Sequence, residues 1–154
     1  MDVEMIIRFF AMRDNLSLDE NNAYHINHYH GRMVNFINHY MLNTDLNKEQ
    51  KEKYKIDFNE VIEKVSLVFG VKDAFKDPTN DKSRANKALA DCILLGLDRF
   101  NSKFLINNKA KILQKLEELL INDSSFKDAI TFRTSDKDIL NSRIDKFIKM
   151  LDAI

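Results

Sequence analysis

Apolar residues recur along most of this chain at intervals of three and four, the spacing that places them on one face of an α-helix. No segment of useful length alternates apolar and polar residues, the pattern of a half-buried strand. The apolar faces comprise Val3, Ile6, Ile7 and Phe10; Met33, Phe36, Ile37, Tyr40 and Met41; Phe58, Val61, Ile62, Val65, Val68 and Phe69; Ala85, Ala88, Leu89, Cys92, Ile93, Gly96 and Phe100; Ile112, Leu113, Leu116, Leu119 and Leu120; and Leu140, Ile144, Phe147, Ile148 and Leu151. We therefore predict an all-α fold, a single helical bundle of about six to seven helices without a sheet.

Capping signals mark both ends of the third helix, which the pattern places at residues 47–69. Asn47 is a suitable N-cap, and Gln50 follows it at the spacing of a capping box. Gly70 follows the last apolar residue, where glycine commonly ends a helix.

Three further local signals concern the later helices. Asp123 or Ser124 is a candidate N-cap of a short sixth helix, and Ser135 with Asp138 resembles a capping box for the last helix. Gly96 lies inside the fourth helix, where glycine costs about 1 kcal/mol relative to alanine. A close helix–helix approach at Gly96 would explain it.

Two stretches lack a helical pattern. Residues 14–30 are polar and rich in Asn and His, which indicates a loop or a broken helix. Pro78 lies in the clearest loop of the chain, and we expect flexibility near 76–82. That loop could separate two helical subdomains, but each would hold only about three helices, so we favour one domain over residues 1–154.

Composition narrows the class of protein further. The chain has 154 residues with three Gly, one Pro and one Cys, which disfavours turn-rich β folds and excludes a disulfide framework. A single Cys suits a reducing compartment, and we expect a cytoplasmic protein that does not contact a membrane. With 24 basic and 24 acidic residues, no net charge attracts the chain to nucleic acid.

All four histidines fall early in the chain, and three of them are candidate metal ligands. His25 and His28 would share a helix face, and His30 follows closely, whereas His39 is farther along. A metal site also needs further ligands and a supporting shell, and no nearby acid has a recognised spacing. The alternative interpretation is a solvated polar loop. We expect no bound metal or other cofactor.

No catalytic motif stands out elsewhere. Cys92 lies on an apolar helix face without a nearby base, which favours a buried thiol over a nucleophile. The three glycines, Gly31, Gly70 and Gly96, are too far apart to form a phosphate-binding loop. We therefore expect this chain by itself to have no catalytic residues.

Basic residues in the second half suggest contact with DNA as an alternative function. Residues 78–154 carry three more basic than acidic groups, a weak excess. The candidate contacts are Lys82, Arg84, Lys87, Lys111, Lys115, Arg143 and Lys146. This function requires these side chains to converge on one face after folding.

Short motifs along nearly the whole chain resemble one known family. The first is D-V-E-M-I-I-R-F-F-A at residues 2–11, and the others comprise Tyr29, Gly31, Phe36, Ile37, Asn38 and Met41; Phe58, Phe69, Gly70, Ala74 and Phe75; Asn86, Ala88 and Leu89; and Arg143 with Ile144. Together they resemble the helical, C-terminal part of the domain-of-unknown-function family 262. That family includes the N-terminal half of GmrSD-type restriction endonucleases.

The resemblance implies a piece of a larger protein of bacterial defence against foreign DNA. Family members carry a ParB-like nuclease/NTPase lobe upstream, marked by D-G-Q-Q-R, and this chain lacks that sequence. The expected function is therefore a non-catalytic helical module that supports or couples the missing lobe. Arg8, Phe9 and Phe10 are candidates for its interface, although Arg8 could instead extend from a core helix.

Overall fold

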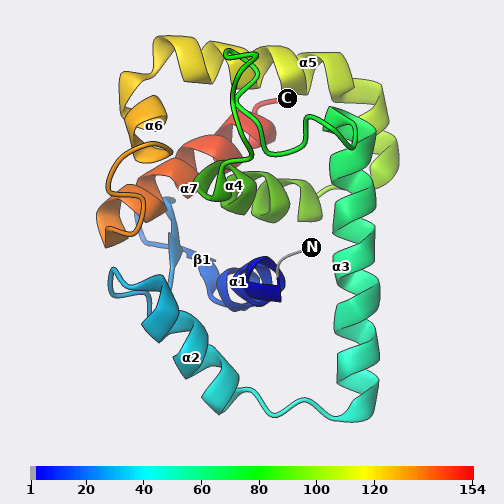
Figure 1. Ribbon diagram of the computed structural model, residues 1–154, viewed down its shortest axis with the longest axis vertical. Coiled ribbons are helices and arrows are strands. Elements are labelled where there is room, and N and C mark those ends of the chain that lie inside the picture. The colour runs from blue at the N-terminus through cyan, green and yellow to red at the C-terminus, as the bar shows by residue number, and fades with distance from the viewer. Residues whose placement is uncertain (1–2) are drawn as a thin grey trace.

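The computed structural model describes residues 3–154, so Met1 and Asp2, where the family-like segment begins, lie outside the described residues. Within that range the chain forms seven helices and one short hairpin (Figure 1). The predicted all-α class is confirmed. In chain order the elements are α1 (Val3–Asp14), β1 (Leu16–Leu18), β2 (Tyr24–Ile26), α2 (Met33–Asn43), α3 (Lys48–Phe69), α4 (Lys87–Asp98), α5 (Ser102–Asn122), α6 (Ser124–Ala129) and α7 (Lys137–Asp152).

Helix α4 lies at the centre of the molecule, and every residue from Ala88 to Leu97 is buried. Helix α7 packs along α4, and α1 and α3 also pack against α4, while α5 contacts α3, α6 and α7 (Figure 1). The predicted close approach at Gly96 is confirmed, because an added Cβ would lie 2.6 Å from Phe147 Cε1 and 2.7 Å from Leu151 Cδ1. Glycine therefore allows α4 and α7 to pack closely.

The predicted boundaries of α3 are confirmed. The Asn47 side chain accepts from the Gln50 N–H at 2.9 Å, and the Gln50 side chain accepts from the Asn47 N–H at 2.9 Å. Gly70 ends the helix with φ +76°, a left-handed conformation that favours glycine.

One of the two later cap predictions is confirmed and the other is wrong. Asp123 caps α6 by accepting from the Phe126 N–H at 2.9 Å. The N-cap of α7 is Asp136, which makes no side-chain capping bond, so the box of Ser135 and Asp138 does not form. Ser135 lies one residue before the cap, and its carbonyl accepts from the Tyr29 hydroxyl.

The hairpin corrects the prediction that the chain has no sheet. β1 and β2 pair antiparallel, with Leu16 opposite Ile26 and Leu18 opposite Tyr24. The outer edge of β2 is completed by α7, because the Tyr24 and Ile26 N–H groups donate to the side chains of Asp145 and Asn141 at 2.8 and 3.0 Å. Each strand alternates over only three residues, too short for a period-two signal.

Residues 70–86 form the loop that Pro78 predicted. Asp77 organises part of it by accepting from the Thr79 N–H at 2.8 Å and from the Lys127 ammonium of α6. The Asn86 N–H donates to the Phe75 carbonyl at 2.8 Å, which closes the loop before α4 begins.

Candidate functional site

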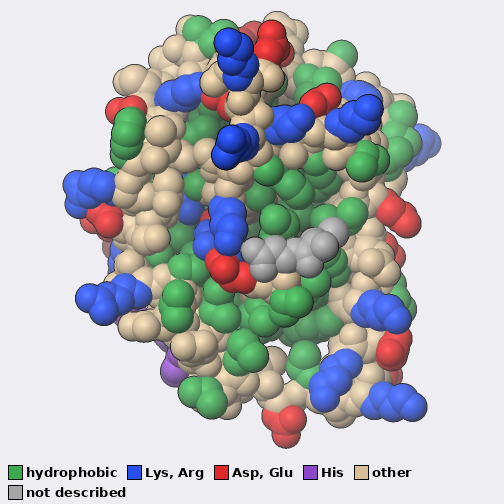
Figure 2. Space-filling view, viewed as in Figure 1, with side chains coloured by type: hydrophobic (Ala, Val, Ile, Leu, Met, Phe, Trp, Pro, Cys, Tyr) green, Lys and Arg blue, Asp and Glu red, His purple; other side chains and the backbone are tan. Residues whose placement is uncertain are grey.

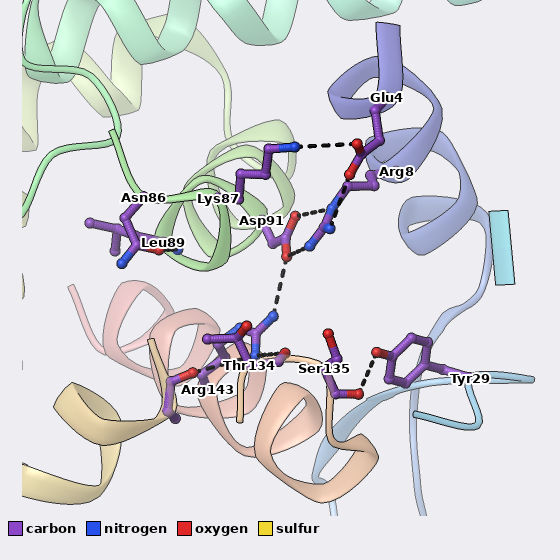
Figure 3. A network of polar contacts seen from close by, with 11 residues as sticks. Glu4, Arg8, Tyr29, Asn86, Lys87, Leu89, Asp91, Thr134, Ser135 and Arg143 are labelled. Atoms are coloured by element: carbon purple, nitrogen blue, oxygen red, sulfur yellow. Dashed lines mark hydrogen bonds and ion pairs between the residues drawn. The ribbon is translucent and has the colours of Figure 1, made fainter. Parts of the chain in front are cut away.

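A buried ionic network joins α1, α4 and α7 (Figure 3). Asp91 of α4 accepts from Arg8 Nε at 3.1 Å through one carboxylate oxygen and from Arg8 Nη2 at 2.5 Å through the other. Arg143 of α7 donates to the same carboxylate at 3.2 Å. Asp91 is 3% exposed and Arg143 is fully buried. One carboxylate therefore serves two guanidinium groups inside the protein.

Backbone carbonyls complete the surroundings of Arg143. Its Nη1 donates to Thr134 O at 2.7 Å, while Nε has no hydrogen-bond partner among the described residues. Burial opposes the charge of Arg8, but the adjacent Asp91 carboxylate outweighs burial and raises the pKa of Arg8. The network therefore joins three helices through charge-assisted hydrogen bonds inside the protein.

This network corrects the assignment of Arg143 as a DNA contact, since a fully buried side chain cannot reach a phosphate. Among the other predicted contacts, Lys115 and Lys146 pair with Glu118 at 2.7 Å and Asp123 at 2.6 Å.

The remaining candidate DNA contacts lie on the surface. Lys87 pairs with Glu4 at 3.2 Å, and the Lys111 ammonium donates to the carbonyl of Ile154 at 3.1 Å. Lys82 and Arg84 are exposed on the 70–86 loop. Charged side chains of both signs lie on the face seen in Figure 2.

The predicted interface of Arg8, Phe9 and Phe10 is also corrected. Phe9 and Phe10 are 1% and 5% exposed, and both pack inside the chain's own core. The Phe10 ring stacks on Tyr54 of α3 at 4.2 Å between centroids, and Phe9 meets Phe58 edge-on. Arg8 pairs with Asp91 as described above. These three residues hold α1 in place and are largely buried.

A cluster of two tyrosines and one carboxylate joins α1, α2 and α3. The Tyr40 and Tyr54 hydroxyls both donate to one oxygen of Asp14 at 2.6 Å. Burial, reinforced by the hydrogen bond to Asp14, raises the pKa of Tyr40 well above its usual value and raises that of Tyr54 as well. Both phenols therefore stay protonated as donors at neutral pH.

An apolar groove lies beside this cluster. It has a volume of about 290 Å³, and its lining residues are Ile7, Phe10, Tyr40, Met41, Thr44, Asp45, Leu46, Lys51 and Tyr54. The visible face is hollowed between the lower ends of α2 and α3, with hydrophobic side chains around the hollow (Figure 2). Met41, one of the lining residues, is 54% exposed, and the same helix α2 also exposes Val34 and Leu42, at 69% and 86%.

The histidines separate into two environments, so the interpretation that His25 and His28 share a helix face is wrong. His25 lies on β2, and its Nε2 is 2.9 Å from the side-chain oxygen of Asn27. His28 and His30 follow the strand and line a different cavity together with His39. Across residues 3–154, no three His, Cys, Asp or Glu side chains are placed to hold a metal ion together.

The thiol of Cys92 is buried, as its apolar neighbours predicted. Burial raises the pKa of Cys92 to about 12, so the side chain is a neutral thiol at physiological pH. Nucleophilic chemistry at Cys92 is therefore disfavoured.

Sequence reasoning missed Asp91 and Asp14. The sequence did contain a signal for Asp91, because a lone carboxylate within the apolar run of α4 needs a buried cation. Asp14 carries no comparable signal, since its role depends on contacts between helices.

Comparison with family models, with characterised proteins and with solved structures yields no match for this chain. Among the helices of residues 3–154, none combines the length and apolarity needed to cross a bilayer. Function must therefore be argued from the surfaces described above.

Proposed function

We propose that this chain is a non-catalytic helical module that binds a second protein lobe through the α2 face. We define the α2 face as the apolar groove together with Val34, Met41 and Leu42. The observation that carries the proposal is the exposure of these three apolar side chains beside that groove. Contiguous apolar surface of this kind commonly marks a protein–protein contact.

The composition of the α2 face supports a protein partner. Its centre is apolar and aromatic, and Asp45 and Lys51 lie among the lining residues as charged groups. An apolar centre with polar groups at its edge is typical of protein interfaces. Burying Leu42, at present 86% exposed, would add about 1.5–3 kcal/mol of favourable transfer free energy.

The resemblance to family 262 supplies the identity of the proposed lobe. We propose a ParB-like nuclease/NTPase lobe of a GmrSD-type bacterial defence protein, coupled to this module. In this proposal the lobe performs the chemistry, and the α2 face binds the lobe. The proposed interface is thus centred on α2 in place of Arg8 and Phe9, which are engaged in the core, and of the three residues only Phe10 contributes to it, as part of the groove lining.

Binding to the lobe in trans tests the proposal. A ParB-like lobe of a GmrSD-type protein is titrated with the purified chain by calorimetry. Met41→Asp and Leu42→Asp should each weaken binding by about tenfold or more, because a charge replaces an apolar contact. Ile121→Asp is the matched control, since Ile121 is 69% exposed on α5, away from the groove, and should leave the affinity unchanged.

Two results would contradict the proposal. The first is an absence of binding, or an equal loss in the α2 and α5 variants. The second is hydrolysis of nucleotide or DNA by the isolated chain above the level of a heat-inactivated control, since the module is proposed to lack catalysis.

A further inference from the structure

A polar cavity of about 510 Å³ lies between the loop after β2 and helix α2. It is separate from the α2 face, and its lining residues are His28, His30, Arg32, Asn35, Phe36 and His39. Three imidazoles and one guanidinium thus gather at one cavity without a carboxylate in its lining. Guanidinium and imidazole N–H groups can donate to an anion, and among the described residues these histidines are not placed to hold a metal ion together.

The loop that carries two of these histidines is anchored from inside. Tyr29, between His28 and His30, is fully buried, and its hydroxyl donates to the Ser135 carbonyl at 2.5 Å. His28 has φ +62° and Gly31 has φ +88°. His28 thus occupies a conformation that non-glycine residues rarely adopt, held by the buried tyrosine beside it. The anchored loop places both imidazoles at the cavity.

The hydrogen-bond donors of the Arg32 guanidinium are not used by other residues in the described part of the chain. Arg8, Arg13 and Arg99 each pair with an aspartate. The Arg32 side chain, in contrast, makes no hydrogen bond or ion pair with any residue in the described part of the chain, and only its backbone carbonyl accepts a bond, from the Phe36 N–H at 3.1 Å. An exposed guanidinium at a cavity presents a planar set of donors that matches the oxygens of a phosphate.

A second cavity of about 320 Å³ continues from the first. The two share His28, Phe36 and His39 in their linings, and the second adds Asp14, Asn15, Tyr40, Asn43 and Thr44. The Asn43 amide donates to the His39 carbonyl at 2.7 Å, which braces this junction. Together the two cavities have room for a ligand larger than a simple ion, with its anionic end at the first cavity, whose lining holds no carboxylate, and a polar end beside Asp14, Asn15 and Asn43 in the second.

We infer that the two cavities bind a small phosphate-bearing molecule, with its phosphate held by Arg32, His28, His30 and His39. The remainder of the ligand, a polar organic group, lies in the second cavity between Asn15 and Asn43. The second cavity shares Tyr40 and Thr44 with the groove of the α2 face. The site uses none of Val34, Met41 and Leu42, so the substitutions that test the two assignments differ and either assignment can fail without the other.

Titrations of the full chain at low salt test this site. The probes are adenosine 5′-monophosphate, adenosine and sulfate, followed by calorimetry and by amide chemical shifts. We expect the monophosphate to bind more tightly than adenosine, and Arg32→Gln to weaken it by about tenfold or more. Arg84→Gln is the matched control, because Arg84 is also exposed and lies on the distant 70–86 loop. Unfolding temperatures of both variants verify that the fold is retained.

Sulfate gives a second readout, since its charge does not change between about pH 6 and pH 8. Imidazoles gain positive charge as the pH falls, so sulfate should bind more tightly at the lower pH. The other ionisable groups that line the cavities are Arg32, Asp14 and Tyr40. His39→Asn should reduce the difference between the two pH values.

Four results would overturn the assignment. They are no binding of the monophosphate at millimolar concentration, equal affinity for adenosine, an equal loss in Arg32→Gln and Arg84→Gln, and tighter binding of a short oligonucleotide through Arg32. The last result would assign the cavity to nucleic acid.

Discussion

The centre of the molecule and its α2 edge differ in two respects: whether charged side chains are paired, and whether apolar side chains are buried. At the centre, the Asp91 carboxylate is shared by Arg8 and Arg143, and α4 is buried along ten consecutive residues. At the edge, Arg32 has no partner among the described residues, and Leu42 is 86% exposed. The comparison shows where stability resides and where the surface is available for binding.

The physical reason is the cost of desolvation. A charge inside the core must be paired, because removing its partner leaves an ion without water or counter-charge. A charge or an apolar side chain at the edge remains in contact with water, so its substitution changes stability little. Mutations in the two regions should therefore differ mainly in their effect on unfolding.

The largest effect is expected from Asp91→Ala. This change leaves the guanidiniums of Arg8 and Arg143 without their carboxylate and should lower the free energy of unfolding by about 3–5 kcal/mol. Urea denaturation followed by circular dichroism measures it. The exposed Glu4 also pairs with Arg8, at 3.6 Å, and Glu4→Gln should cost less than about 1 kcal/mol. Similar losses in the two variants would remove the distinction between centre and surface.

An intermediate effect is expected from Asp123→Asn, at the junction of α5 and α6. The hydrogen bond from Lys146 of α7, opposed by burial and supported by Ser125 and the Phe126 N–H, lowers the pKa of Asp123 to about 2. Because the pKa of Asp123 is lower in the folded than in the unfolded protein, its ionised form stabilises the fold at pH values above the unfolded-state pKa near 4. This stabilisation is lost as the pH falls toward 2.

Because Asp123 is about one-third exposed, the loss in Asp123→Asn at pH 7 should be about 1 kcal/mol. The asparagine side chain can still accept the capping hydrogen bond from the Phe126 N–H, so the substitution measures the contribution of the negative charge alone. Thermal melts at about pH 7 and pH 2 measure the effect. The variant should lose less stability on acidification than the parent protein, and an identical acid dependence would contradict the assignment.

The smallest effect on stability is expected from Leu42→Ser. Because Leu42 is already largely in water, the free energy of unfolding should change by less than about 0.5 kcal/mol. Binding of the proposed lobe should nevertheless weaken. Urea denaturation and calorimetry on the same preparation give both quantities. A large loss of stability would indicate that Leu42 belongs to the core and would contradict its assignment as a docking residue.

The sequence by itself determined the helices and most of their ends, because these depend on residues within about four positions of one another. The capping box of Asn47 and Gln50 and the cap at Asp123 were predictable in this way. A glycine inside a helix indicated a close approach at Gly96, but not that α7 would be the partner helix. The strands at 16–18 and 24–26 were missed because their pairing is completed by side chains of α7.

Only the tertiary structure decided which polar residues act together. Asp91 lies 83 positions from Arg8 and 52 from Arg143, so local periodicity carries no information about their pairing. The same holds for His39, which joins His28 and His30 only because α2 folds back beside their loop, whereas His25 turns to Asn27. Local spacing sets the backbone of each element, but the partner of a charge is set by how the elements pack.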